Sequence, residues 1–184
     1  MEMLSDTVLW ARARTGDADA FGALFERHAE AIYNYCFRRT GEWATAEDLL
    51  SVVFLEAWRR RDSELPAEKV LPWLYGIATN VVRNQRRSER RFTAALRQVP
   101  EPEPEPDFSE ASAERVDDER RMRDALALLR QLPRRDREVF ALCSWMGLSY
   151  EDAAIALCIP VGTVRSRLSR AKARLRELDS SLRT

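Results

Sequence analysis

The sequence contains little glycine, three scattered cysteines and one histidine. Its six glycines form no glycine-rich phosphate loop, and it has no nucleophile elbow and no base with an orienting partner. Cys36, Cys143, Cys158 and His28 are too few and too far apart for a zinc site or a disulfide framework. We therefore expect no metal, no cofactor and no catalytic residues, which means that the chain is not expected to be an enzyme.

Long apolar runs are also missing. No run approaches the roughly 18–20 residues of a membrane-spanning helix. The first residues lack the basic and then apolar order of a signal peptide. Apolar residues nevertheless make up 45% of the chain, which is enough for a folded core. These features predict a cytoplasmic protein with reduced thiols and no direct membrane insertion.

Convincing period-two alternation is absent as well, so we predict an all-α fold. In the N-terminal part, apolar residues at spacings of three and four indicate helices around 21–36, 46–58 and 73–81. In the C-terminal part, helices are predicted at about 119–131, 135–146, 149–157 and 161–178.

The zero net charge hides a strong asymmetry along the chain. Residues 1–97 carry a net charge of +1, residues 98–119 carry −8, and residues 120–184 carry +7. The acidic part includes four of the eight prolines between Pro100 and Pro106, which prevents a helix there. A basic segment masked by an acidic one suggests polyanion binding.

These observations predict two small helical domains joined by a flexible, acidic, proline-rich linker. The domains are expected at residues 1–92 and 119–184, with the linker at 93–118.

The C-terminal domain contains a helix-turn-helix pattern, in which a short helix and a three-residue turn precede a longer basic helix. Ser149 is expected to cap the short helix. The long helix has an apolar stripe for packing against the other helices. The stripe consists of Val164, Leu168, Ala171, Leu175 and Leu178.

The opposite face of this helix is suited to the major groove of DNA. Arginine can bond guanine twice, and serine can bond bases or phosphates. Backbone donors at the helix N-terminus can bind a phosphate. The predicted DNA-binding residues are Thr163, Arg165, Ser166, Arg167, Ser169, Arg170 and Lys172. The alternative is a solvated, arginine-rich surface helix.

A second basic and amide-rich surface runs from Asn80 to Arg91, with five arginines and one acid. Amides can read exposed base edges while arginines contact phosphates. The predicted nucleic-acid residues here are Asn80, Arg83, Asn84, Arg86 and Arg87. A solvated helix end remains the alternative. The polar positions of the helix at 46–58 face either a partner protein or solvent.

Three segments in order resemble bacterial RNA polymerase sigma factors of the extracytoplasmic-function (ECF) group. The helix at 46–58 resembles the family motif that docks on the polymerase clamp, although Ser51 and Val52 stand where the family usually has Gln and Glu. Residues 73–80 with the arginine-rich run resemble the part that melts and reads the minus-ten element. Residues 162–172 resemble the recognition helix for the minus-thirty-five element.

The resemblance implies a sigma factor that binds core RNA polymerase and directs promoter-specific transcription initiation. Its partners would be core polymerase, double-stranded and melted promoter DNA, and an anti-sigma factor. The implied polymerase-binding residues are Asp48, Leu49, Ser51, Val52 and Phe54. The linker would be either a nucleic-acid mimic in the polymerase cleft or a solvated tether.

Two other functions are compatible with the residues. One is a stand-alone helix-turn-helix transcriptional regulator with an N-terminal sensing or interaction domain. The other is a helical protein-interaction adaptor without a DNA role.

Overall fold

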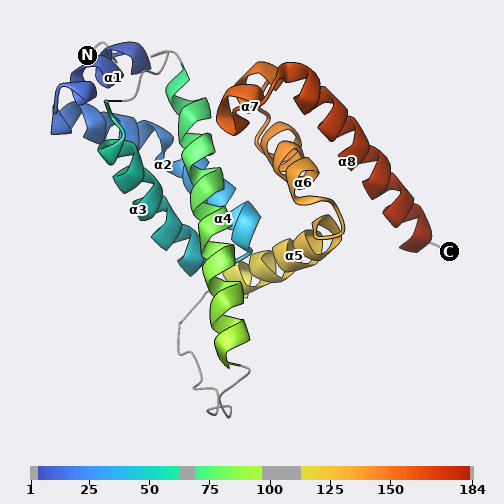
Figure 1. The fold of residues 1–184 in the computed structure, drawn as a ribbon. Helices are drawn as coiled ribbons and strands as arrows, with labels where there is room; N and C mark the ends of the chain where they lie inside the picture. The colour runs from blue at the N-terminus through green and yellow to red at the C-terminus, as the bar shows by residue number, and fades with distance from the viewer. Residues whose placement is uncertain (1–3, 63–68, 97–112, 183–184) are drawn as a thin grey trace.

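The structure, a computed structural model, describes residues 4–62, 69–96 and 113–182 (Figure 1). Over these ranges the chain is helical and has no strand, which confirms the all-α prediction. The elements are α1 Asp6–Arg14, α2 Ala18–Thr40, α3 Trp43–Arg59, α4 Val70–Leu96, α5 Ala113–Leu129, α6 Arg134–Phe140, the π-helical turn η2 Ala141–Trp145, α7 Tyr150–Leu157 and α8 Val161–Leu182. None of the helices in the described ranges has the length and apolar character needed to cross a membrane.

Side-chain and glycine caps set several of the helix boundaries. The Asp17 carboxylate accepts a hydrogen bond from a backbone N–H in the first turn of α2, at 3.0 Å. At the other end, Gly41 adopts a left-handed φ of 82°, and its N–H donates to the Phe37 carbonyl at 2.8 Å. Ser149 Oγ accepts from the Asp152 N–H at 3.0 Å, as predicted for the start of α7. Local hydrogen bonds therefore set these helix boundaries.

Helices α1–α4 pack around a common apolar core, in which α2 contacts the other three. Trp73 is half-buried, and its ring packs edge-on against the buried Trp10 with centroids 4.9 Å apart. Trp58 is half-buried and packs against Phe21, with centroids 5.1 Å apart. These tryptophans stabilise the bundle and do not form an exposed stacking surface.

Helix α4 lies in the middle of the molecule, with α2 and α3 on one side and the C-terminal helices on the other (Figure 1). Its buried residues share one continuous apolar core with α7. The two helices approach closely at Gly76, where a Cβ atom would lie only 2.6 Å from the carbonyl oxygen of Ala156. The absence of a side chain at Gly76 therefore lets α4 and α7 pack together.

The predicted linker, 93–118, is wrong at both ends. Residues 93–96 are the last residues of α4, and residues 113–118 are the first of α5. The second segment has no proline, and its acidic Glu114 lies in the first turn, where a carboxylate favours the helix dipole. The proline-rich part, 97–112, lies outside the described residues.

Candidate nucleic-acid interface

The turn between α7 and α8 has the predicted three residues, 158–160. Cys158 ends α7 in a left-handed conformation with a φ of 52°. The N–H of Ile159 then donates to the Ala154 carbonyl at 3.1 Å, and the Val164 N–H donates to the Pro160 carbonyl at 3.1 Å. These bonds fix the orientation in which α8 leaves the turn.

The apolar stripe of α8 packs inward as predicted. Val164, Leu168 and Ala171 are buried. Leu175 packs against a smaller apolar cluster that includes Leu129. Because one face of α8 is buried, the opposite face of the same helix is presented to solvent.

The predicted DNA-binding residues of α8 occupy the solvent face and its edges. Thr163 and Arg167 are half-buried, whereas the others are exposed: Arg165, Ser166, Ser169, Arg170 and Lys172. The Arg165 guanidinium lies over the Tyr150 ring, 5.7 Å from its centroid. Ser166 donates a hydrogen bond from Oγ to the Thr163 carbonyl at 3.1 Å. The face therefore combines a partly oriented arginine with small polar side chains.

Arg170 on this face has a carboxylate partner. Its Nη2 and Nε donate to the two carboxylate oxygens of Asp136 on α6, at 3.3 and 3.4 Å. The Arg170 side chain is still 61% exposed. Asp136 therefore orients the Arg170 guanidinium. The exposed part of the Arg170 side chain remains accessible to DNA.

The residues predicted on α4 divide between two faces of the helix. Asn80 and Asn84 line a groove of about 460 Å³ between α3 and α4. Arg83, Arg86 and Arg87 line a different cavity, which faces α6. The sequence run that appears as one basic surface therefore forms two surfaces.

The groove between α3 and α4 has an apolar side and an amide-rich side. Leu49 and Ile77 contribute the apolar surface, and Asn80, Asn84 and Gln85 contribute amides that can donate and accept hydrogen bonds. Such a combination can contact the face of a base and its edge at once.

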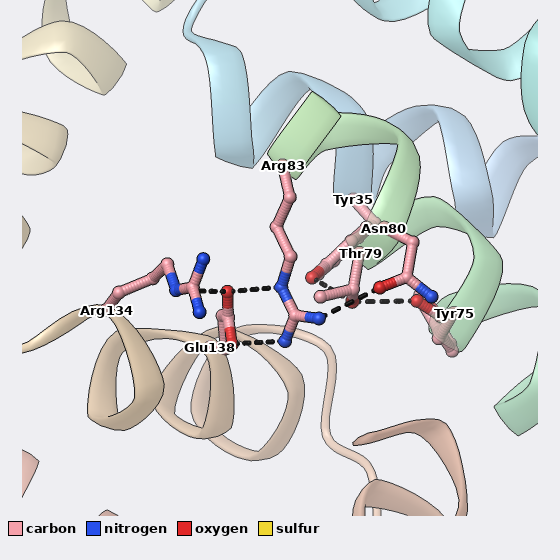
Figure 2. Close-up of polar contacts among 7 residues, drawn as sticks. All are labelled: Tyr35, Tyr75, Thr79, Asn80, Arg83, Arg134 and Glu138. Atoms are coloured by element: carbon pink, nitrogen blue, oxygen red, sulfur yellow. Dashed lines mark hydrogen bonds and ion pairs between the residues drawn. The ribbon is translucent and has the colours of Figure 1, made fainter. Parts of the chain in front are cut away.

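Arg83 is bound to the C-terminal half of the chain (Figure 2). Its Nε donates to Oε1 of Glu138 at 2.7 Å, and its Nη2 donates to Oε2 at 2.5 Å. Its Nη1 donates to Oδ1 of Asn80 at 2.9 Å. The Glu138 side chain is only 1% exposed, and its hydrogen bonds raise the pKa of Arg83.

This pairing bears on the prediction that Arg83 binds a nucleic acid. In the described arrangement its guanidinium is directed at α6, although its side chain remains 32% exposed. The reason is the buried Glu138 carboxylate, which requires a cationic partner. Asn80 Oδ1 is likewise occupied by Arg83, although the Asn80 side chain remains exposed in the groove.

A buried polar chain orients the same part of α4 (Figure 2). The Thr79 hydroxyl donates to the Tyr75 carbonyl at 2.8 Å. Because its one proton is used there, the Tyr35 hydroxyl donates to Thr79 Oγ1, also at 2.8 Å. Burial raises the pKa of Tyr35, which keeps the phenol protonated. The chain joins α2 to α4 directly beside Asn80.

A second ion pair joins the two halves at the start of α4. Lys69 Nζ donates to Oδ1 of Asp152 in α7 at 2.8 Å. Burial alone would raise the pKa of Asp152, but the hydrogen bonds from Lys69 and Ser149 lower it. The sequence analysis missed both acidic partners, Asp152 and Glu138, because no local pattern shows which distant cation a carboxylate meets.

The predicted polymerase-binding residues lie partly on the surface of α3 and partly in the core. Asp48, Ser51 and Val52 are exposed, but Leu49 and Phe54 are buried. The latter two therefore support the helix from inside. The sequence analysis missed Leu55, which is 49% exposed next to Val52 at 42%. Its helical spacing of seven from Asp48 was the available signal.

Two family profiles match the chain in order. Sigma-70 region 2 matches residues 24–92, and Sigma-70, region 4 matches residues 122–175. Among curated relatives, RNA polymerase sigma factor CarQ of Myxococcus xanthus is 35% identical over 91% of this chain and 93% of its own. The ECF RNA polymerase sigma factor SigL of Mycobacterium tuberculosis is 33% identical over 89% and 91%.

Solved structures agree with this result. The sigma factor RpoE of Bartonella quintana, in complex with the anti-sigma factor NepR, has a TM-score of 0.63 and is 26% identical, covering 87% of this chain and 96% of that one. CnrH, in complex with the cytosolic domain of CnrY, has a TM-score of 0.70 at 24% identity, covering 96% and 97%. The second similarity concerns the fold alone.

Proposed function

This chain belongs to the ECF group of the sigma-70 family of RNA polymerase sigma factors, and we propose that it binds core RNA polymerase and directs it to specific promoters. The observation that carries the proposal is the presence of both sigma regions on one chain, with an exposed basic face on α8 above a buried apolar seam. Region 2 denotes residues 24–92, and region 4 denotes residues 122–175.

For α8 we propose a division between base reading and phosphate contact. Arg165, Ser166 and Ser169 read base edges in the major groove of the minus-thirty-five element. Phosphates are contacted by Arg167, Arg170 and Lys172, and by backbone donors around Thr163. Five of these residues are exposed, Thr163 and Arg167 are half-buried at the edges of the face, and a buried seam lies beneath them, which supports this assignment.

For the minus-ten element, we propose that the groove between α3 and α4 receives the melted strand. Asn80 and Asn84 would contact an exposed base. Arg86 and Arg87 lie on the other face of α4, beside Arg83. They would contact DNA phosphates only after α6 has moved away, since Glu138 on α6 pairs with Arg83 in this structure.

We further propose that the exposed face of α3 docks on core polymerase. Asp48, Ser51, Val52 and Leu55 make up this face, and exposed apolar residues beside polar ones are typical of a protein interface. In this function the protein is not an enzyme, and it acts in the cytoplasm with the polymerase. An anti-sigma factor is a further partner, as in the complex of the Bartonella relative.

In vitro transcription with core polymerase on a promoter library tests the function directly. We expect the chain to select a defined set of promoters, with no sequence-specific footprint in the absence of polymerase. A nanomolar footprint without polymerase would instead identify the stand-alone regulator, and unchanged polymerase output would contradict the sigma function.

Arg165→Ala and Lys172→Ala should have different effects on promoter binding. Arg165→Ala should cost about 1–3 kcal/mol and relax preference at one base position. Lys172→Ala should weaken all sequences alike and reduce the salt dependence by about one phosphate contact. Binding of the polymerase holoenzyme to promoter variants at several salt concentrations measures both. Arg14→Ala, an exposed arginine of α1, is the control, and altered base preference in Lys172→Ala would contradict the assignment.

Val52→Asp should weaken core polymerase binding by about tenfold or more. Burial of a valine side chain contributes about 1.5–3 kcal/mol, and the introduced carboxylate would lose hydration at the interface. Titration of labelled protein with core polymerase measures the change. Val8→Asp is a matched control, because Val8 is exposed to the same 42% on α1. Equal affinities of the two variants would show that α3 does not dock this way.

A further inference from the structure

A cavity of about 560 Å³ lies between the C-terminal end of α2, helix α4 and helix α6. Among the described residues that line it, eight are arginines and the one carboxylate belongs to Glu138. The cavity is thus a strongly cationic space between region 2 and region 4. It lies on the other side of α4 from the amide-rich groove between α3 and α4, and Arg91 lines both.

Glu138 neutralises only a small part of this charge. Both of its oxygens accept hydrogen bonds from Arg83, at 2.7 and 2.5 Å, and Arg134 Nε lies 3.9 Å from one of them. Arg39, Arg86 and Arg137 also line the cavity, and among the described residues it has no second carboxylate for them.

Buried donors in the cavity also lack acceptors. Arg39 is only 2% exposed, yet its Nε and Nη1 have no hydrogen-bond partner in the described part of the chain. The same holds for Nε of Arg137. The Arg39 guanidinium lies 5.9 Å from the Tyr35 ring centroid, a contact that satisfies no N–H group. Buried charged donors without acceptors are costly, and an acceptor in the cavity would remove that cost.

The electrostatics of the neighbouring arginines agree with a missing anion. The pKa of Arg86 is lowered to about 10, mainly by burial and to a smaller extent by the charges of Arg39, Arg137 and Arg130. The pKa of Arg137 is also lowered, mainly by burial and to a smaller extent by the positive charge of Arg39. These cations repel one another across a partly desolvated space, and a bound anion would offset this repulsion because it attracts each of them.

We propose that the cavity binds a small phosphate anion with two or more negative charges, either free pyrophosphate or the polyphosphate group of a nucleotide. Guanidinium groups match phosphate oxygens in paired hydrogen bonds, and the volume is within the range of small-molecule sites. The burial of Arg39 favours a small ion over a nucleic acid duplex, whose backbone reaches only exposed side chains.

A bound phosphate would connect the two halves of the protein. It would contact Arg39 and Arg86 from region 2, and Arg134 and Arg137 from region 4. Occupancy would therefore favour the closed arrangement, in which Arg83 pairs with Glu138. If the proposed minus-ten role of Arg86 and Arg87 is correct, the anion would also compete with promoter DNA.

The test uses the full chain without polymerase, so that its outcome is independent of the promoter function. Calorimetry and thermal unfolding are measured with sodium pyrophosphate, with a nucleoside triphosphate, and with sodium chloride at the same ionic strength. We expect saturable binding and a raised melting temperature with the phosphates only. Tighter binding of the triphosphate would identify a nucleotide as the source, and equal or weaker binding would identify the free anion.

Arg137→Gln should weaken pyrophosphate binding by at least tenfold, and Arg90→Gln, at an exposed edge of the cavity, should weaken it by a smaller factor. Arg120→Gln, an exposed arginine of α5, should leave it unchanged. If Arg137→Gln does not fold, Arg90→Gln decides. The proposal is overturned if chloride gives the same stabilisation, if the cavity variants bind like Arg120→Gln, or if a DNA duplex binds as tightly as pyrophosphate with the same loss in the cavity variants.

Discussion

Gly76→Ala is expected to separate region 2 from region 4. The new methyl carbon would lie 2.6 Å from the carbonyl oxygen of Ala156, and backbone cannot yield as a flexible side chain can. Overpacking of this kind costs about 1–3 kcal/mol. Alanine is meanwhile favoured over glycine inside a helix by about 0.5–1 kcal/mol, so that α4 itself should not be weakened. The contact between α4 and α7 is therefore the feature that fails.

Small-angle scattering should detect this separation as an increased radius of gyration, while circular dichroism should show unchanged helix content. Gly22→Ala is a matched control, because Gly22 also lies inside a helix, but no atom outside its own helical turn and chain neighbours lies within 4 Å of its Cβ position. That variant should keep the wild-type radius. An unchanged radius for Gly76→Ala would mean that α7 shifts without releasing α4.

Glu138→Ala is expected to destabilise the protein by about 3 kcal/mol. Removal of one partner from a buried ion pair costs about 3–5 kcal/mol, because the remaining charge is left without its counter-ion. The lower end applies here, since the Arg83 side chain is 32% exposed and can regain some water. The substitution also removes the only carboxylate that lines the arginine-rich cavity in the described residues, which increases repulsion across it.

Urea unfolding of the two variants Glu138→Ala and Glu56→Ala gives the comparison. Glu56 also faces two arginines, Arg59 and Arg60, but on the surface of α3, where such pairs contribute roughly 0–1 kcal/mol. We expect a loss of less than 1 kcal/mol for Glu56→Ala. Similar losses in the two variants would contradict the role of the interdomain pair. Stronger binding of single-stranded minus-ten DNA by Glu138→Ala would show that Arg83 has been released.

Most of the local structure follows from the sequence. The seam from Val164 to Ala171 is visible because helical residues at spacings of three and four share a face. Ser149 caps α7 because its side chain can reach a first-turn N–H group, whatever the rest of the fold does. The helix-turn-helix and the exposed basic face of α8 depend on such short-range relations, and both are found as predicted.

The errors arose where a residue has more than one role on a helix. The sequence places Leu49 and Phe54 in a motif that binds polymerase, but their side chains fill the core beneath it. Helix α5 begins earlier than predicted because acidic residues that suit a linker also suit a helix N-terminus. Composition alone does not separate these cases.

The sequence by itself determined the helices, their caps and the basic face of α8, because these depend on residues a few positions apart. Only the tertiary structure decided how the two regions meet. Arg83 and Glu138 are 55 residues apart, and their pairing depends on the packing of α4 against α6 and α7. The same packing directs the Arg83 guanidinium at α6 and buries Arg39 among like charges. Long-range contacts of this kind follow from the packing of whole helices, and no local periodicity encodes them.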